Sequence, residues 1–202
     1  MKKIMFSDKF GLTEAVLSGR KTQTRRVVPR SFFTCTHDIL DDNTLVCEDM
    51  YGDWHDIRKT RYALQVGEVV AVAQSYHSFY NDECDPRMFP DGAGWTNKMF
   101  ARADLMPFQI RITDVRVERL QDISDEDCIA EGIREVEVDN NWGKYATHTE
   151  YRIVYQDKYG REKLLIGMTP REAYAALIDR ISGKGTWESN PYVFVYEFEL
   201  IK

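Results

Sequence analysis

The chain has 202 residues, of which 43% are hydrophobic and 30% charged, and its formal net charge is −6. This length suits one domain with a sizeable core, and the acidic balance argues against a long nucleic-acid footprint on the surface. No apolar run approaches the roughly 20 residues that a membrane-spanning helix requires, and no signal-peptide core is apparent, so we expect a cytoplasmic protein without membrane contacts.

Cysteine and histidine are too scattered to predict a disulfide framework or a metal site. The four cysteines, Cys35, Cys47, Cys84 and Cys128, include no C-x-x-C pair, so free thiols are expected. Cys35 and His37 could supply two metal ligands, but nothing nearby completes a site. Because no Walker loop or dinucleotide fingerprint is present either, we expect neither a metal nor a cofactor.

The N-terminal part predicts a strand, a short helix and a basic turn. A strand is expected at Lys3–Phe6, and a helix at Thr13–Ser18 with Thr13 as its N-cap and Gly19 just past its end. Extended structure resumes at Arg25–Val28, so Lys21–Thr24 is expected to connect two ordered elements. Connections of this kind often carry functional groups.

The basic turn contrasts with the acidic chain around it. Arg20, Lys21, Arg25 and Arg26 lie close together in sequence with two threonines between them. In a chain of net negative charge, such a cluster indicates a site for an anionic or polar ligand. The alternative is a solvated surface, which is what most short basic runs form.

The middle of the chain predicts several strands and one long loop. Strands are expected at 44–47 and 61–64, and a buried strand at Val69–Ala73. The polar, glycine-containing segment Tyr80–Thr96 is expected to be a loop. Trp95 either anchors that loop to the core or lines a pocket.

The next strand changes the parity of its apolar face. Ile110 and Ile112 have even numbers, whereas Val115 and Val117 have odd ones. One regular strand would therefore turn its apolar face over. A β-bulge near Thr113–Asp114 restores the face and bends the strand, as barrel strands require.

A short helix with an unusual last carboxylate follows. Ser124 is expected to cap it, three acidic residues occupy its first turn, and Gly132 ends it. Glu131 lies at the C-terminal end, where the peptide dipoles disfavour a negative charge. This position suits a proton donor, although Glu131 could equally be one more surface carboxylate.

The C-terminal part adds a β-rich segment at about 134–167, with a hairpin within it, and then a helix and a strand. A capping box at Thr169–Glu172 starts the helix, and Gly183 ends it. The final strand, Tyr192–Leu200, is rich in β-formers and is expected to lie centrally. Many short strands with few helices indicate an α+β fold built on a small mixed barrel.

Four stretches in order resemble the ASCH family, a branch of the PUA-like β-barrels. They are Gly19-x-Lys21-x-x-Thr24-x-Arg26, Val66–Val69, Ala130–Ile133 and Val193–Phe198. The chain is similar to the longer, phage-related and bacterial forms of the family. The resemblance implies a single PUA-like domain over 1–202, an insertion at about 134–167, and a cleft that recognises RNA or a nucleoside.

One small bacterial branch of this family removes the acetyl group from N4-acetylcytidine. The resemblance implies that Thr24 is the nucleophile, Lys21 its base and Glu131 the proton donor, which are the groups that amide cleavage needs. Lys21 can act as a base only if its pKa is lowered, and nearby arginines would lower it. Alternatively, Lys21 contacts phosphate and Thr24 caps a turn.

The expected ligand contacts come from three arginines and three other side chains. In the longer family members, the strand after the Gly67 turn carries an arginine and a glutamate, which this chain lacks. Gln74 in that strand is therefore expected to read a neutral base edge. Tyr76 and Trp95 are expected to stack on bases. The arginines expected to contact the ligand are Arg20, Arg25 and Arg26.

Three functions remain open from the sequence. The first is an amidohydrolase acting on N4-acetylcytidine or a related acylated nucleoside, which requires Lys21, Thr24 and Glu131 to share one pocket. The second is a non-catalytic module that binds single-stranded RNA or a nucleotide in a salt-sensitive manner. The third is a phage-associated accessory protein that makes only protein contacts.

Overall fold

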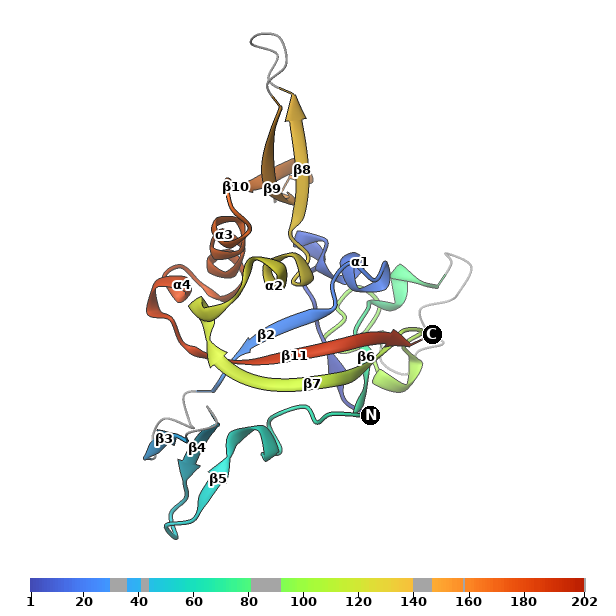
Figure 1. Ribbon diagram of the computed structural model, residues 1–202. Coiled ribbons are helices and arrows are strands. Elements are labelled where there is room, and N and C mark those ends of the chain that lie inside the picture. The colour runs from blue at the N-terminus through green and yellow to red at the C-terminus, as the bar shows by residue number, and fades with distance from the viewer. Residues whose placement is uncertain (30–35, 41–43, 81–91, 140–146, 158, 202) are drawn as a thin grey trace.

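The computed structural model describes residues 1–29, 36–40, 44–80, 92–139, 147–157 and 159–201. It shows a mixed α+β fold, with strands in three sheets and a few helices (Figure 1). The strands are β1 (Lys3–Ile4), β2 (Gln23–Val27), β3 (His37–Ile39), β4 (Leu45–Glu48), β5 (Trp54–Asp56), β6 (Val69–Val72), β7 (Gln109–Arg119), β8 (Arg134–Asp139), β9 (Thr147–Gln156), β10 (Glu162–Gly167) and β11 (Tyr192–Ile201). The α-helices are α1 (Leu12–Leu17), α2 (Asp125–Ala130), α3 (Pro170–Ser182) and α4 (Thr186–Ser189).

The largest sheet has five strands in the order β1-β6-β7-β11-β2. Only β1 and β6 pair in parallel; the other neighbours are antiparallel. Strand β11 is hydrogen-bonded on both sides, which confirms its predicted central position. The outer strands β1 and β2 do not pair with each other, so the sheet is open, and no closed barrel forms in the described part of the chain.

The predicted bulge in β7 is confirmed. Ile112 pairs with Phe198 and Asp114 pairs with Glu197, so Thr113 has no partner across the ladder. The extra residue keeps the apolar side chains on both sides of it facing the core, because it shifts the alternation by one position.

Helices α1 and α3 are capped differently at their N-termini. The Thr169 cap of α3 is confirmed, since its hydroxyl accepts from the Glu172 N–H at 3.2 Å. The Glu172 carboxylate accepts from the Met168 N–H at 2.8 Å rather than from that of Thr169, so the reciprocal half of the predicted capping box is shifted by one residue. The predicted cap of α1 is wrong: Gly11 is the N-cap, with φ of 63°. The Thr13 hydroxyl instead donates to the Asp8 carboxylate at 2.5 Å and is 3.2 Å from the Phe6 carbonyl, so it ties α1 to the segment before it.

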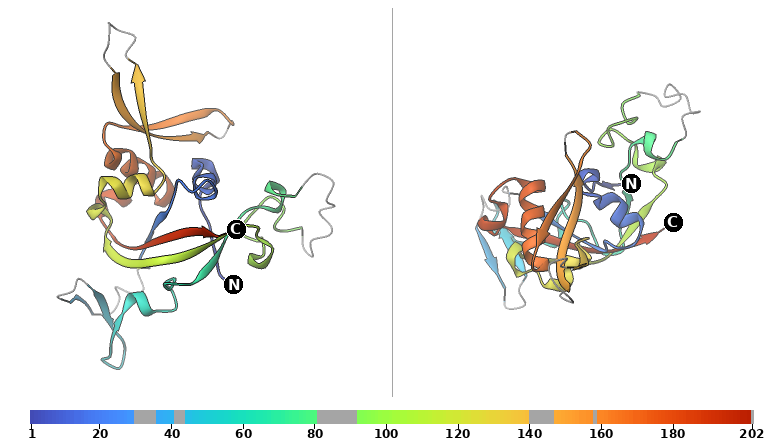
Figure 2. Two further views of the ribbon diagram at one scale, coloured as in Figure 1. Left: turned by 45° about the vertical axis from the view of Figure 1, so that its right-hand side comes forward. Right: turned by 90° about the horizontal axis from the view of Figure 1, so that it is seen from above.

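The two smaller sheets lie on opposite sides of the large one. Strands β10-β9-β8 form one and β3-β4-β5 the other (Figure 2). The β9–β10 hairpin was predicted. The strand predicted at 61–64 does not form, because the Ala63 N–H closes a turn onto Thr60 and the Leu64 N–H donates to the Tyr196 hydroxyl. Most of the predicted loop at 80–96 lies outside the described residues.

The helices and the largest sheet bury one main core, with a smaller apolar cluster beside it. Cys128 is a free thiol; Cys35 and Cys84 lie outside the described residues. The longest described helix, α3, has 13 residues. None of the helices seen here combines the length and apolarity needed to span a bilayer.

Candidate functional site

Helix α2 carries Glu131 into the interior. Ser124 caps the helix by accepting a hydrogen bond from the Asp127 N–H at 3.1 Å, as predicted. At the other end, Gly132 adopts φ of 104°, a positive value that favours glycine. Glu131 lies just before this turn and is only 4% exposed. The carboxylate is therefore held inside the protein rather than on its surface.

Lys21 reaches the same place from the turn after α1. The backbone N–H of Lys21 donates to Ala15 at 2.9 Å, and that of Thr22 donates to Ala130 at 3.0 Å, so the turn is fastened to α1 and α2. Lys21 is 2% exposed. Its Nζ donates to the Glu131 carboxylate and, at 2.8 Å, to the Glu131 carbonyl. Residues far apart in sequence thus form one buried ion pair.

The pKa of Lys21 is lowered from its ordinary value. Burial is the largest cause, because the ammonium loses its hydration. Glu131 opposes the shift, whereas Arg26 and Arg25 add to it. From the sequence, the arginines were expected to lower the pKa of Lys21, and the helix end was expected to disfavour the negative charge of Glu131. In the structure burial acts more strongly on the lysine, and two cations contact the carboxylate.

Strand β2 provides the threonine. Side chains alternate along a strand, so Thr24 and Arg26 share one face, and Gln23 and Arg25 the other. Thr24 was predicted to lie in a connection but belongs to the strand, paired with Tyr196 of β11. It is 4% exposed, and its hydroxyl has no hydrogen bond to any residue that the structure describes. The strand fixes this hydroxyl more firmly than a loop would.

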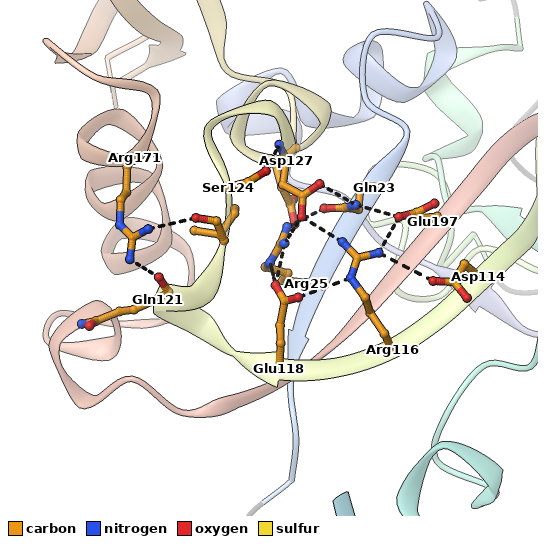
Figure 3. A network of polar contacts seen from close by, with 12 residues as sticks. Gln23, Arg25, Asp114, Arg116, Glu118, Gln121, Ser124, Asp127, Arg171 and Glu197 are labelled. Atoms are coloured by element: carbon orange, nitrogen blue, oxygen red, sulfur yellow. Dashed lines mark hydrogen bonds and ion pairs between the residues drawn. The ribbon is translucent and has the colours of Figure 1, made fainter. Parts of the chain in front are cut away.

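Arg25 contacts Glu131 of the ion pair and links it to two further carboxylates, Glu118 and Asp127, which Figure 3 shows. Its Nη1 is 3.4 Å from Glu131 Oε1, its Nη2 is 2.6 Å from Asp127 Oδ2, and its Nε is 2.9 Å from Glu118 Oε1. Gln23 accepts a further bond from Nη1 at 2.6 Å. Burial opposes the charge, but Glu131 and Glu118 outweigh it and raise the pKa of Arg25. Arg25 therefore fixes the position of the Glu131 carboxylate.

Arg116 completes the network from the solvent side (Figure 3). Its guanidinium contacts Asp127 at 2.8 Å and Glu118 at 3.3 Å, and it also pairs with Glu197. These are two of the carboxylates that hold Arg25. The network thus braces Glu131 indirectly, through side chains on β7, α2 and β11.

A cavity of about 910 Å³ opens beside the ion pair. Five predicted site residues line it: Lys21, Thr24, Arg25, Arg26 and Glu131. Apolar side chains from α1, α3 and the N-terminal segment form part of its wall, among them Phe6, Leu12, Leu177 and Ile178. A largely apolar wall with a few convergent polar groups is typical of a small-molecule site, and the volume lies in the usual range.

Tyr174 was missed by the sequence analysis. It lines the cavity from α3 and is 1% exposed, and its hydroxyl has no hydrogen-bond partner among the described residues. Burial raises its pKa well above the ordinary value. A signal was present, because Tyr174 lies three and four residues before Leu177 and Ile178 on the apolar face of the helix. Because the apolar face of α3 is expected to pack inward, the Tyr174 hydroxyl on that face is expected to be buried.

Four predicted ligand contacts do not line the cavity. Arg20 is exposed at the end of the turn. Gln74 is buried elsewhere, with its Oε1 unpaired. Tyr76 and Trp95 belong to the smaller apolar cluster, where the Tyr76 hydroxyl accepts from the Arg102 N–H at 2.9 Å. Trp95 packs against this cluster and does not line the cavity, and most of the loop that it was predicted to anchor lies outside the described residues.

Comparisons of the chain with protein-family models, with curated proteins and with solved structures returned no match. Within the described ranges, no three histidine, cysteine, aspartate or glutamate side chains cluster so as to hold a metal ion. The site itself offers a buried base–acid pair, Lys21 and Glu131, beside a cavity. It also offers hydroxyl groups and a guanidinium N–H that have no partner among the described residues.

Proposed function

We propose that this cavity is the active site of a metal-independent amidohydrolase that acts on N4-acetylcytidine or a related acylated nucleoside. The observation that carries the proposal is that Lys21, Glu131 and the Thr24 hydroxyl line one cavity, with the lysine and the carboxylate in direct contact. Amide cleavage needs a nucleophile, a base and a proton donor within reach of one carbonyl. The three side chains can supply these groups.

The proposed reaction has two halves. The Thr24 oxygen attacks the acyl carbon while its proton passes to Lys21, and the C–N bond breaks as Glu131 protonates the departing amine. The acyl group then remains on Thr24 as an ester. In the second half Glu131, now ionised, takes a proton from a water molecule that attacks the ester carbon, and Lys21 returns its proton to the Thr24 oxygen as the ester C–O bond breaks. Acetic acid leaves and ionises in solvent, and all three side chains regain their starting forms.

The contact between Lys21 and Glu131 suits this chemistry. The mechanism requires a neutral amine and a protonated carboxyl group. The charged pair and the neutral pair hold the same number of protons, so moving one proton across the hydrogen bond from Nζ to Oε2 converts one into the other. Burial disfavours the charged form of the pair, because desolvating two ions is costly. The reactive form is therefore reached without exchange of protons with solvent.

We also propose an ASCH-type, PUA-like barrel as the underlying fold, with 134–167 as an insertion in a single domain. Two observations support this. Lys21, Thr24 and Arg26 of the G-x-K-x-x-T-x-R motif all line the cavity, and the bulge at Thr113 bends β7 as a barrel strand would require. A nucleoside substrate would place the enzyme in the cytoplasm.

A non-catalytic RNA- or nucleotide-binding module is the second candidate. It is favoured by buried donors on Arg26 and Tyr174 that have no acceptor in the described structure. It does not explain why Lys21 and Glu131 are buried beside an unpaired threonine hydroxyl. A role in protein contacts alone does not explain why Lys21 and Glu131 are buried together beside Thr24 at the cavity.

Hydrolysis of N4-acetylcytidine tests the proposal. The purified protein is expected to release cytidine and acetate, measured by chromatography, and Lys21→Met to abolish the release while keeping a side chain of similar length. Arg20→Met, which alters an exposed residue of the same turn, is the control and is expected to retain activity. Absence of cytidine at high enzyme concentration, or full activity in Lys21→Met, would contradict the proposed function.

A further inference from the structure

Two hydrogen-bond donors on residues that line the cavity have no acceptor in the described part of the chain. The Tyr174 hydroxyl and the Arg26 Nε–H are both buried, and neither has a partner in the part of the chain that the structure describes. Buried donors in folded proteins are almost always paired. The two groups come from α3 and β2, and both line the same cavity. Together they mark a place where a bound ligand would supply oxygen acceptors.

Arg26 is half-buried and differs from Lys21 and Arg25, the two buried cations of the site. Lys21 and Arg25 pair with carboxylates, whereas Arg26 makes no ion pair with a described carboxylate. Its Nη2 donates to the Met5 carbonyl at 2.5 Å, and its guanidinium lies 5.6 Å from the centre of the Phe6 ring. These contacts orient the guanidinium without neutralising it. Burial lowers the pKa of Arg26, against the influence of Glu131, which reflects a charge held away from water.

The spacing between Arg26 and Thr24 fits a ligand with two functional ends. They are two residues apart on one strand face, so their Cα atoms are separated by roughly 7 Å, and the arginine side chain extends the reach further. A ligand whose acyl carbon lies at Thr24 would place a second group near Arg26. Arginine is well suited to bind phosphate there, because its planar donors match the phosphate oxygens.

We propose that the cavity binds a nucleotide, whose phosphate oxygens accept hydrogen bonds from the Arg26 Nε–H and the Tyr174 hydroxyl, rather than an uncharged nucleoside. This inference rests on the proposed function and names its substrate class: an acylated nucleoside monophosphate. The phosphate neutralises Arg26 and pairs both unpaired donors at once. It takes no part in the bond-breaking steps.

Calorimetric titration with cytidine and with cytidine 5′-monophosphate tests this without requiring catalysis. The wild-type protein is expected to bind the monophosphate about tenfold more tightly or better, since hydrogen bonds to charged groups are among the stronger ones. Arg26→Gln is expected to bring the two affinities close to equality, and Tyr174→Phe to reduce the preference several-fold. Arg20→Gln removes the same charge from an exposed position of the same motif and is expected to leave the preference unchanged.

Equal wild-type affinities for the two compounds, or no binding of either, would overturn the inference. So would an unchanged preference in Arg26→Gln. If Arg26→Gln does not fold, Tyr174→Phe decides, because phenylalanine fills the same space and removes only the hydroxyl. Hydrolysis of N4-acetylcytidine without a phosphate preference would defeat this inference alone. A phosphate preference without hydrolysis of any acylated substrate would defeat the enzymatic function alone.

Discussion

Replacing Glu131 with glutamine removes the charge from the buried pair and almost nothing else. Lys21, 2% exposed, would then lack a carboxylate, whereas Arg25 would keep Glu118 and Asp127. Removing one partner of a buried ion pair typically costs 3–5 kcal/mol. We expect the low end, about 3 kcal/mol, because a lysine can lose its proton when buried. For a chain of this length, this corresponds to a fall in Tm of roughly 6–12 °C.

The loss of stability should depend on pH. Burial already lowers the pKa of Lys21, and Glu131 opposes that shift, so the variant lowers it further. Between the lowered folded-state pKa and the unfolded-state value near 10.4, the unfolded chain binds more protons than the folded one, and stability rises with pH. The deficit of Glu131→Gln relative to wild type is therefore greatest below the folded-state pKa and shrinks as pH rises through it.

Urea unfolding of four proteins at pH 6 and pH 9 measures this effect. Glu131→Gln is expected to be less stable than wild type, more so at pH 6, and Lys21→Met/Glu131→Gln to recover stability, because it removes the unpaired charge. Glu126→Gln, exposed on the same helix, is the matched control. If Glu131→Gln were as stable as this control at both pH values, the reasoning about the buried pair would be refuted.

Three further predictions concern the free energy of unfolding. Tyr174→Phe is expected to leave it unchanged or raise it by up to about 1 kcal/mol, because the buried hydroxyl is unpaired; a clear loss would reveal a hydrogen bond. Gly132→Ala is expected to cost about 1–3 kcal/mol, because its φ of 104° lies well outside the left-handed range at about 57° that other residues can adopt. It should cost more than Gly160→Ala, whose φ of 74° lies closer to that range; equal costs would contradict this. Arg25→Met is expected to cost about 3 kcal/mol, because it breaks a buried ion-pair network. Arg116→Met is expected to cost under about 1 kcal/mol, because the Arg116 side chain is 32% exposed. The reverse order would refute the conclusion that Arg25 fixes the position of the Glu131 carboxylate.

Local features of the fold could be predicted because local signals determine them. The parity change across Thr113 required a bulge, and the structure has it there. Ser124 and Thr169 cap the helices that their sequences predict. The cap predicted at Thr13 is wrong, because the helix already starts at Leu12 with Gly11 as its N-cap, so Thr13 lies inside the first turn.

The site was only partly predictable, because its contacts join distant parts of the chain. Lys21 and Glu131 were singled out separately, but no sequence signal showed that they touch. Arg25 was expected to face a ligand and instead engages three carboxylates. Tyr76 was expected to stack on a base and instead packs in its own apolar cluster, because the segment that carries it folds away from the cavity. Secondary-structure propensity and sequence spacing carry no information about such contacts between distant residues.

The role of the Thr24 hydroxyl is the central claim, and the release of cytidine from N4-acetylcytidine by four proteins at high enzyme concentration tests it most directly. Wild type is expected to release cytidine, Thr24→Ser to retain part of the rate, and Thr24→Val, which keeps the shape but not the hydroxyl, to fall to the uncatalysed level. Thr22→Val, at an exposed position of the same turn, is expected to match wild type. Release by Thr24→Val at the wild-type rate, or by none of the proteins, would contradict the account.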